Sequence, residues 1–280
     1  MKKSIIPGGL GIALFAITGC GGGTGSVSFD TWGEEYIEEA IPASEFEDGW
    51  TITFDKFLVH IGHVTVADAE GTTGAKMDGT IVFDHKLPGV KPVFTAADLE
   101  ARPWEKVSFE IPVTGADAAL SDGVTEEDKQ LLLDSGASIY VIGSATKGAD
   151  TKTFEWAFPV GTRFEDCKGE RDGKETPGAL VTNGGTDQVQ LTIHGDHLFY
   201  DDLQSPNAAL RFDPIAAADS NADGEVTLEE LSAVKLFDID VGTYGTGSAA
   251  DIDDLGAFVT ALSQTVGHFR GEGECFSKPL

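Results

Sequence analysis

The stretch Trp50-Thr-Ile-Thr-Phe-Asp-Lys-Phe57 alternates apolar and polar side chains. A period of two is typical of a β-strand with one buried face, because successive side chains of a strand point to opposite sides. The pattern continues from Leu58 to Val66, and Gly62 within it indicates a bend or a bulge. We therefore expect strand structure throughout residues 50–66.

Outward from this stretch, the same criteria predict five more strands. They cover residues 80–85, 106–113, 138–145, 153–160 and 188–194. The segment Lys147-Gly-Ala-Asp150 lies between two of them and is typical of a hairpin loop. Many short strands interrupted by Gly, Asp and Pro predict a mainly β chain, with an antiparallel β-sandwich over residues 28–200.

Two segments of this region do not fit a strand. Residues 125–134 begin with an acidic first turn and continue with Leu131-Leu-Leu133, which predicts a short helix. Residues 165–185 are rich in charged side chains and glycine, and we expect an exposed loop there.

The N-terminus has the composition of a secretory signal. Two lysines precede a short, interrupted apolar run that ends in Ile17-Thr-Gly-Cys20. The run is too short to cross a bilayer. Its ending resembles the lipobox of bacterial lipoproteins. This resemblance implies a signal peptide over residues 1–19, cleavage before Cys20, and lipid attached to that cysteine.

The residues after Cys20 bear on where such a lipoprotein is anchored. Gly21, in place of an aspartate, implies the outer membrane by the same resemblance. Residues 20–27 are glycine-rich and are predicted to form a flexible tether. The alternative is an ordinary signal peptide in which the cysteine is a coincidence.

The charge of the chain limits its partners. It carries 47 acidic side chains against 19 Lys and Arg, a formal net charge of −28. Such a surface disfavours nucleic acid and anionic lipid headgroups. It favours divalent cations, a basic partner, or a salty medium that screens the repulsion. The hydrophobic share of 41% is ordinary for a globular protein, so a core can form.

Two further cysteines, Cys167 and Cys275, remain besides Cys20. In an exported protein an even pair predicts one disulfide, which would tie the C-terminal tail to the β-sandwich. Two separate thiols are the alternative.

Residues 219–230, which we call the acidic loop, have the sequence Asp-Ser-Asn-Ala-Asp-Gly-Glu-Val-Thr-Leu-Glu-Glu. Calcium prefers six to eight oxygen ligands, and alternate side chains of a tight loop can point at one centre. The order resembles the calcium loop of the EF-hand family, with Gly224 at the position of the sharp turn. The resemblance implies six ligands. Asp219, Asn221, Asp223 and Glu230 would bind through their side chains, Glu225 through its backbone carbonyl, and Thr227 either directly or through a water. An acidic surface loop before a helix is the alternative.

The resemblance covers about residues 206–240. Pro214 predicts a short or kinked entering helix, and apolar spacing predicts helices over 227–237 and 251–266. One full loop is present. The segment Asp238-Ile-Asp-Val-Gly242 is either a degenerate partner loop or a plain turn. We therefore expect a calcium-binding helical segment over residues 201–280.

A second candidate metal site is His194-Gly-Asp-His197, at the end of the last predicted strand. Two imidazoles three residues apart offer ligands for zinc or copper, and His268 would be a third if the tail folds back. Nearby carboxylates are Asp196, Asp201 and Asp202. The alternative is that these histidines hydrogen-bond neighbouring carboxylates. His60 and His63 are weaker candidates, because a spacing of three puts them on opposite faces of a regular strand.

Two function classes follow. The first is a calcium-binding lipoprotein of the cell envelope, a non-catalytic structural or partner-binding module. The alternative is a transition-metal protein that stores or delivers copper or zinc through His194 and His197. No phosphate loop, dinucleotide fingerprint or convincing nucleophile elbow is present, so no enzymatic activity is predicted. The expected partners are the membrane, through the lipid, and an envelope protein.

Overall fold

The computed structural model describes residues 22–171, 173–240, 243–249 and 251–280. The predicted signal peptide and Cys20 lie outside the described residues. Strand β1 (Thr24–Trp32) begins within residues 20–27, so a paired strand replaces the predicted tether from Thr24 onward. Within the described ranges, no helix combines the length and apolar character needed to cross a bilayer.

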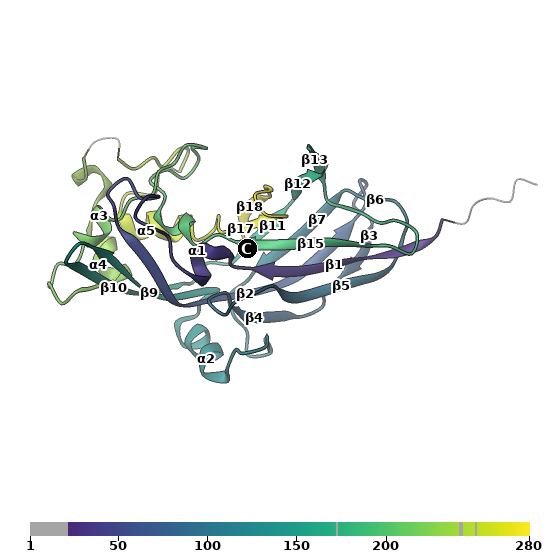
Figure 1. Cartoon of the computed structure of the whole chain (residues 1–280), viewed down its shortest axis with the longest axis horizontal. Helices are drawn as coiled ribbons and strands as arrows, with labels where there is room; N and C mark the ends of the chain where they lie inside the picture. Colours follow the sequence, from purple (N-terminus) through teal and green to yellow (C-terminus); the bar gives the residue numbers. More distant parts are fainter. Residues whose placement is uncertain (1–21, 172, 241–242, 250) are drawn as a thin grey trace, which may run out of the picture.

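One large sheet is built around β2 (Thr51–Ala67), as Figure 1 shows. Its strand order is β16-β10-β9-β2-β7-β11-β18, with β3 and β4 paired to β2, and β8 paired to β4. The other strands are β3 (Thr73–Lys76), β4 (Thr80–Asp84), β7 (Lys106–Ile111), β8 (Ala119–Leu120), β9 (Ile139–Lys147), β10 (Asp150–Phe158), β11 (Thr162–Glu165), β16 (Glu225–Val226) and β18 (Phe276–Pro279). The strand predicted over 50–66 is confirmed, and so is the hairpin between β9 and β10.

A smaller sheet has the order β17-β15-β1-β5. Its further strands are β5 (Lys91–Glu100), β15 (Thr186–Ile193) and β17 (Gly267–Phe269). The prediction of a mainly β chain is confirmed. The purely antiparallel arrangement is wrong, because β1 pairs in parallel with β15, β10 with β16, and β4 with β8. Long connections separate the strands of each such pair, so no tight hairpin forces the antiparallel direction.

The two sheets share one hydrophobic core. Phe29 and Val189 enter it from the smaller sheet, and Phe57 and Phe109 enter it from the larger one. All four side chains are almost completely buried. The shared core holds β15 and β17 against the large sheet, which positions the residues at their ends.

A second, smaller core lies beneath α2 (Glu126–Ser135) and contains Leu58 and Leu132. The helix predicted over 125–134 is thus confirmed. Thr125 Oγ1 accepts a hydrogen bond from the Asp128 backbone N–H at 3.2 Å, and the Asp128 carboxylate accepts one from the Thr125 N–H at 2.9 Å. This reciprocal capping satisfies two backbone donors that would otherwise lack partners at the helix start.

The segment over 165–185 is not the loop that the sequence predicts. Strands β12 (Lys168–Arg171) and β13 (Lys174–Pro177) form a hairpin, and β14 (Ala179–Leu180) pairs with β6 (Pro103–Trp104). A two-stranded hairpin with mostly exposed side chains has too few apolar residues to show an alternating pattern.

The C-terminal helices are shorter than predicted. They are α4 (Leu228–Ala233) and α5 (Leu255–Leu262), with α3 (Asp213–Ala216) before them; α1 (Glu34–Glu38), η1 (Asp196–Phe199) and η2 (Leu236–Asp238) complete the helices. Backbone bonds from Leu255 to Val234 and from Leu236 to Asp253 draw the chain out of α4 and delay the start of α5. The short entering helix, with Pro214 in its first turn, is confirmed.

Cys167 and Cys275 form a disulfide, as the sequence predicts. Together with the pairing of β18 and β11, it holds the C-terminal tail against the large sheet.

Candidate metal centre

Three histidine rings from two separate parts of the chain lie against one another. The ring centroids are 4.3 Å apart for His194 and His268, 4.8 Å for His197 and His268, and 5.5 Å for His194 and His197. A ligand atom from each of His194, His268 and Glu272 lies within 4.8 Å of the other two. We call these four residues, with the adjoining cavity of about 560 Å³, the histidine cleft. The structure thus brings together the three histidines that the sequence singles out.

The smaller sheet positions two of these rings. β15 ends at Ile193, which pairs with Gly267 of β17, and Thr192 pairs with His268. The His194 backbone N–H continues the ladder with a bond of 2.9 Å to the Val266 carbonyl. His194 therefore leaves one strand close to the point where His268 sits on its neighbour.

A sharp turn after β15 brings the third ring back. Gly195 lies so close to the core that a Cβ at this position would stand 2.7 Å from Cγ1 of Ile37 and 3.0 Å from the ring of Phe54. Any other residue would force the turn away from the core. The turn leads into η1, where His197 faces the other two histidines.

Glu272 reaches the cleft from the turn after β17. Arg270 and Gly271 both have positive φ, at 57° and 79°. The Thr192 hydroxyl donates to the Gly271 carbonyl at 2.6 Å, which fixes this turn to β15. The sequence analysis missed Glu272. The signal that it overlooked is an acidic residue four positions after His268, just before the disulfide cysteine.

The hydrogen bonds of His197 define which ring nitrogen carries its proton. The Thr265 hydroxyl donates to the Leu262 carbonyl at 2.9 Å, so its oxygen acts as an acceptor toward His197 Nδ1, 2.9 Å away. Nδ1 therefore bears the hydrogen, and Nε2 keeps its lone pair. Fixing one nitrogen through a hydrogen bond while leaving the other free is the usual arrangement of a metal-binding histidine.

His194 has no such partner. Its Nε2 is buried and makes no hydrogen bond to the described residues. The Glu34 carboxylate oxygen is 3.6 Å from it, beyond hydrogen-bonding distance. The alternative that His194 and His197 simply hydrogen-bond carboxylates is therefore wrong. His197 bonds the Thr265 hydroxyl, and the carboxylate near His194 is too distant for a hydrogen bond.

Burial disfavours the charged forms of His197 and His268. It places the pKa of His197 well below its ordinary value, with smaller effects from His268 and His194. Burial, followed by the electrostatic effect of the neighbouring His194 ring, lowers the pKa of His268 to about 4. Neutral imidazoles have the lone pairs that zinc and copper bind.

Carboxyl groups surround these rings. Burial raises the pKa of Glu34 and of Asp196, which lies almost completely buried in η1. Tyr200 donates from its hydroxyl to Asp196 at 3.0 Å. Neutral nitrogen ligands ringed by acidic groups make a site that attracts cations.

The two other acids near His197 in sequence have different roles. Asp201 accepts from Arg211 at 2.7 Å, which places it in an ion pair. Asp202 caps the next turn by accepting from the backbone N–H groups of Gln204 and Ser205, although it also lines the cavity. Neither belongs to the histidine group.

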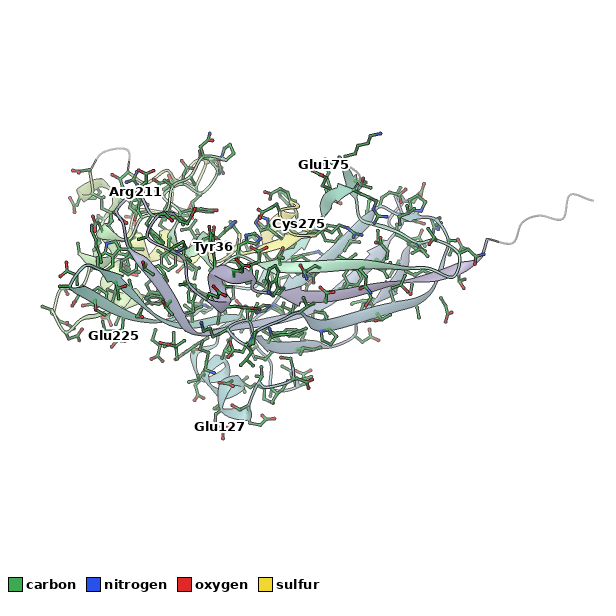
Figure 2. All side chains as sticks on the ribbon, in the orientation of Figure 1. Tyr36, Glu127, Glu175, Arg211, Glu225 and Cys275 are labelled. Carbon is green, nitrogen blue, oxygen red and sulfur yellow. A yellow bond between two sulfur atoms is a disulfide. The ribbon has the colours of Figure 1, made fainter. Side chains whose placement is uncertain are left out.

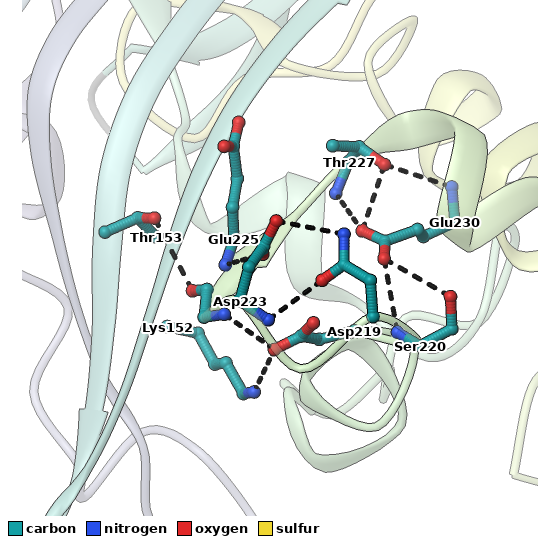
Figure 3. Close-up of polar contacts among 10 residues, drawn as sticks. Lys152, Thr153, Asp219, Ser220, Asp223, Glu225, Thr227 and Glu230 are labelled. Atoms are coloured by element: carbon teal, nitrogen blue, oxygen red, sulfur yellow. Dashed lines mark hydrogen bonds and ion pairs between the residues drawn. The ribbon is translucent and has the colours of Figure 1, made fainter.

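The acidic loop has a different geometry, which Figure 3 shows. Its side-chain oxygens are largely engaged by the loop itself. Asn221 Oδ1 accepts from the Asp223 N–H at 2.8 Å, Asp223 accepts from the Glu225 N–H at 2.9 Å, and Glu230 accepts from the Thr227 N–H at 3.1 Å. Gly224 has φ 91°, which confirms the predicted sharp turn. Among the described residues, the loop carboxylates do not gather as closely as the ligands of the histidine cleft.

Asp219 is the one acid of the loop with a free buried oxygen. Its side chain is 1% exposed. Oδ2 accepts from the Lys152 ammonium at 2.5 Å and from the Gly224 N–H at 3.0 Å, whereas Oδ1 is buried with no partner among the described residues. The acidic loop also pairs through β16 with β10. Its pairing partner is therefore a strand of the large sheet and not a second calcium-type loop.

The two regions are separate. In Figure 2, Glu225 of the acidic loop and Cys275, which lines the histidine cleft, lie in different parts of the molecule. They are nevertheless linked through helices, because α4 packs against α5, and Thr265 just after α5 holds His197.

Comparisons with known proteins give little further information. No protein-family model matches the chain. No curated protein matches it either. Among solved structures, the chain is similar to MbnP from Methylosinus trichosporium, with 9% sequence identity over 63% of this chain and 77% of that one, and a TM-score of 0.30. A likeness of this size carries no inference about fold or function.

Proposed function

We propose that this protein is a non-catalytic transition-metal-binding protein that holds copper or zinc in the histidine cleft. The observation that carries the proposal is the meeting of His194 and His197 with His268, which is about seventy positions further along the chain. Burying three imidazoles together is unfavourable unless their polar nitrogens find partners. The nitrogens Nε2 of His194 and Nδ1 of His268 have none among the described residues.

The ligand types define the class of metal. Imidazole nitrogens suit zinc and copper, whereas calcium and magnesium prefer oxygen. Glu272, which is exposed, adds a carboxylate oxygen from the open side of the cleft. Three nitrogens and one oxygen make a set of four ligands, the usual number for zinc.

Metal analysis of the purified protein tests this proposal. We expect the variant His194→Ala/His197→Ala to hold one equivalent of copper or zinc fewer than the unmodified chain. A matched control is Asp201→Asn, which lies next to the site but belongs to the ion pair with Arg211. Unchanged metal content in the double variant would contradict the proposal.

A second candidate function is calcium binding by the acidic loop, with the EF-hand-like segment packed on a β-sandwich body. The free, buried Oδ1 of Asp219 favours it, because a buried carboxylate oxygen without a donor is a ready cation ligand. Calcium would replace the Lys152 ammonium as the cationic partner of Asp219. The remaining ligands, Asp223 and Glu230 above all, would exchange internal hydrogen bonds for the metal.

The cellular setting is also a proposal. We infer that cleavage before Cys20 and lipid on its sulfur anchor the chain in the outer membrane, where it meets an envelope protein partner. Replacing Cys20 by Ser should release the protein from the membrane fraction. Membrane association that persists without lipid on the N-terminal peptide, measured by mass spectrometry, would refute the anchor. A pull-down with and without a chelator would show whether the partner depends on metal.

A further inference from the structure

A second cavity, of about 280 Å³, lies away from the histidine cleft. It is lined by two imidazoles and two carboxylates, those of His60, His63, Asp78 and Asp117. The remaining lining residues include Pro112, whose carbonyl contacts one of the rings.

The two histidines share a face because β2 is irregular. Phe57, Val59 and Ile61 point into the main core, and after them Val64 and Val66 do so. The inward side thus changes from odd to even positions, which requires one extra residue, and the register of β2 against β7 shifts between Gly62 and Thr65. The expectation that His60 and His63 lie on opposite faces is therefore wrong.

Backbone conformation supports this bulge. His63 has φ 52°, in the left-handed region that few residues other than glycine adopt. Gly62 allows β2 to approach the start of β4, since a Cβ there would stand 2.7 Å from the Gly79 carbonyl oxygen. The chain accepts a strained backbone at the position that directs His63 into the cavity.

His60 has the hydrogen-bonding pattern of a metal ligand. Its Nδ1 lies 2.8 Å from the Pro112 carbonyl, and because a carbonyl only accepts, Nδ1 carries the hydrogen. Nε2 therefore keeps the lone pair. It is buried without a hydrogen-bond partner among the described residues, in a side chain that is 2% exposed. Burial lowers the pKa of His60, so the ring is neutral near pH 7.

We propose that His60 and His63, with a carboxylate from Asp78 or Asp117, form a second transition-metal site of the zinc and copper class. The candidate ligand atoms are not gathered as closely in this structure as those of His194, His268 and Glu272, so a bound metal would draw them together. Nitrogen ligands exclude calcium as the preferred ion, and the Pro112 carbonyl orients the His60 ring as an outer hydrogen-bond partner of a metal ligand does. The site shares no residue with the histidine cleft, so this proposal can be tested independently of the function proposed above.

Zinc titration in the background His194→Ala/His197→Ala tests the second site. The full chain is dialysed against zinc with excess magnesium, which occupies carboxylate-only sites, and bound zinc is then measured. We expect one equivalent in this background and two in the unmodified chain. Adding His63→Asn should remove the remaining equivalent, and asparagine tolerates the positive φ of this position.

The matched control is Asp98→Asn in the same background. Asp98 also has a positive φ, 57°, and is exposed on β5, away from the cavity lining. This change should leave zinc binding unaltered. If zinc is already absent before His63 is replaced, or survives its replacement, the second site is refuted.

A spectroscopic measurement covers the case in which a variant folds poorly. In the unmodified chain, zinc should shift the imidazole nitrogen resonances of His60, recorded by long-range proton–nitrogen correlation. His85 serves as the internal control, because its Nε2 bonds the Thr31 hydroxyl at 2.8 Å and its ring is completely buried. Resonances of His60 that stay fixed at two equivalents of zinc would overturn the proposal.

Discussion

The histidine cleft and the acidic loop are both rich in metal-ligating groups, yet they are built in opposite ways. The candidate ligands of the loop follow one another within twelve residues of sequence, and several of their oxygens accept hydrogen bonds from the loop's own N–H groups. The candidate ligands of the cleft come from the end of β15, from η1, from β17 and from the turn after β17. Buried nitrogens of His194 and His268 have no partner among the described residues.

The difference shows what a metal would do in each region. In the cleft, a metal would satisfy nitrogens that the protein leaves unsatisfied, so binding displaces little. In the loop, a metal must displace internal hydrogen bonds and the Lys152 ammonium before it is bound. We therefore expect tight binding of transition metal in the cleft and weaker binding of calcium in the loop.

The largest expected effect concerns the disulfide. The variant Cys167→Ala/Cys275→Ala removes the disulfide, which links residues separated by 108 positions. The chain-entropy model gives a loss of up to about 4–5 kcal/mol in the free energy of unfolding. Urea unfolding measures it. Since Glu272 is three residues from Cys275, zinc affinity should also fall, whereas calcium affinity of the loop should not. An equal loss of zinc affinity and calcium affinity would show that the two regions do not differ in their dependence on the disulfide.

Acid should affect the metal-free cleft before it affects the loop. The pKa of His268 is lowered to about 4, while an unfolded imidazole titrates near 6.5. Between these values the unfolded chain binds more protons than the folded chain. The free energy of unfolding should therefore decrease as the pH is lowered, by up to about 3 kcal/mol.

Urea titrations with chelator at several values from about pH 7 to about pH 5 measure this slope, which should be flatter in His268→Gln. The acidic loop titrates in a lower pH range. The hydrogen bond from the Lys152 ammonium is the main cause that lowers the pKa of Asp219, and the hydrogen bond from the Thr227 backbone N–H is the main cause that lowers the pKa of Glu230. Their stabilisation is present above the unfolded carboxyl pKa and is lost only below about pH 4. Identical slopes in the variant and the unmodified chain would show that His268 is not shielded from protons.

The Thr265 hydroxyl, which orients His197, should affect zinc affinity of the cleft but have little effect on calcium affinity of the acidic loop. Thr265→Val removes the acceptor of the Nδ1 hydrogen while keeping the side-chain shape. Loss of such an outer partner typically weakens metal binding by about 10–100-fold. Competition with a zinc chelator measures the change. Thr260→Val, on helix α5 just before Thr265, is the matched control and should bind zinc normally. Unaltered affinity in Thr265→Val would mean that His197 is not a ligand.

The smallest effect is expected for Glu230→Gln in the acidic loop. The change keeps the size of the side chain and removes one charged oxygen, so calcium affinity should drop by about tenfold or more. Calorimetric titration compares it with Glu229→Gln, the neighbouring acid, for which we expect no change. Equal heats in all three proteins would mean that the loop is an acidic turn and not a calcium site.

Local patterns predicted much of the secondary structure. The alternation over 50–66 and the capped helix near Thr125 depend on neighbours in sequence, so both were predictable. The hairpin at β12 and β13, the parallel partner of β1 and the shortening of α4 were not, because long-range pairing decides them. The disulfide was predictable because the cysteines present allowed few pairings.

The sequence by itself determined the order of the oxygen-bearing residues in the acidic loop and named His194, His197 and His268 as candidates, because residue type and short spacing carry that information. Only the tertiary structure decided that the three rings meet, that Glu272 joins them, and that a bulge turns His60 and His63 to one side. Strand pairing and burial decide these contacts. Both depend on residues tens to hundreds of positions apart, whose proximity no local pattern encodes.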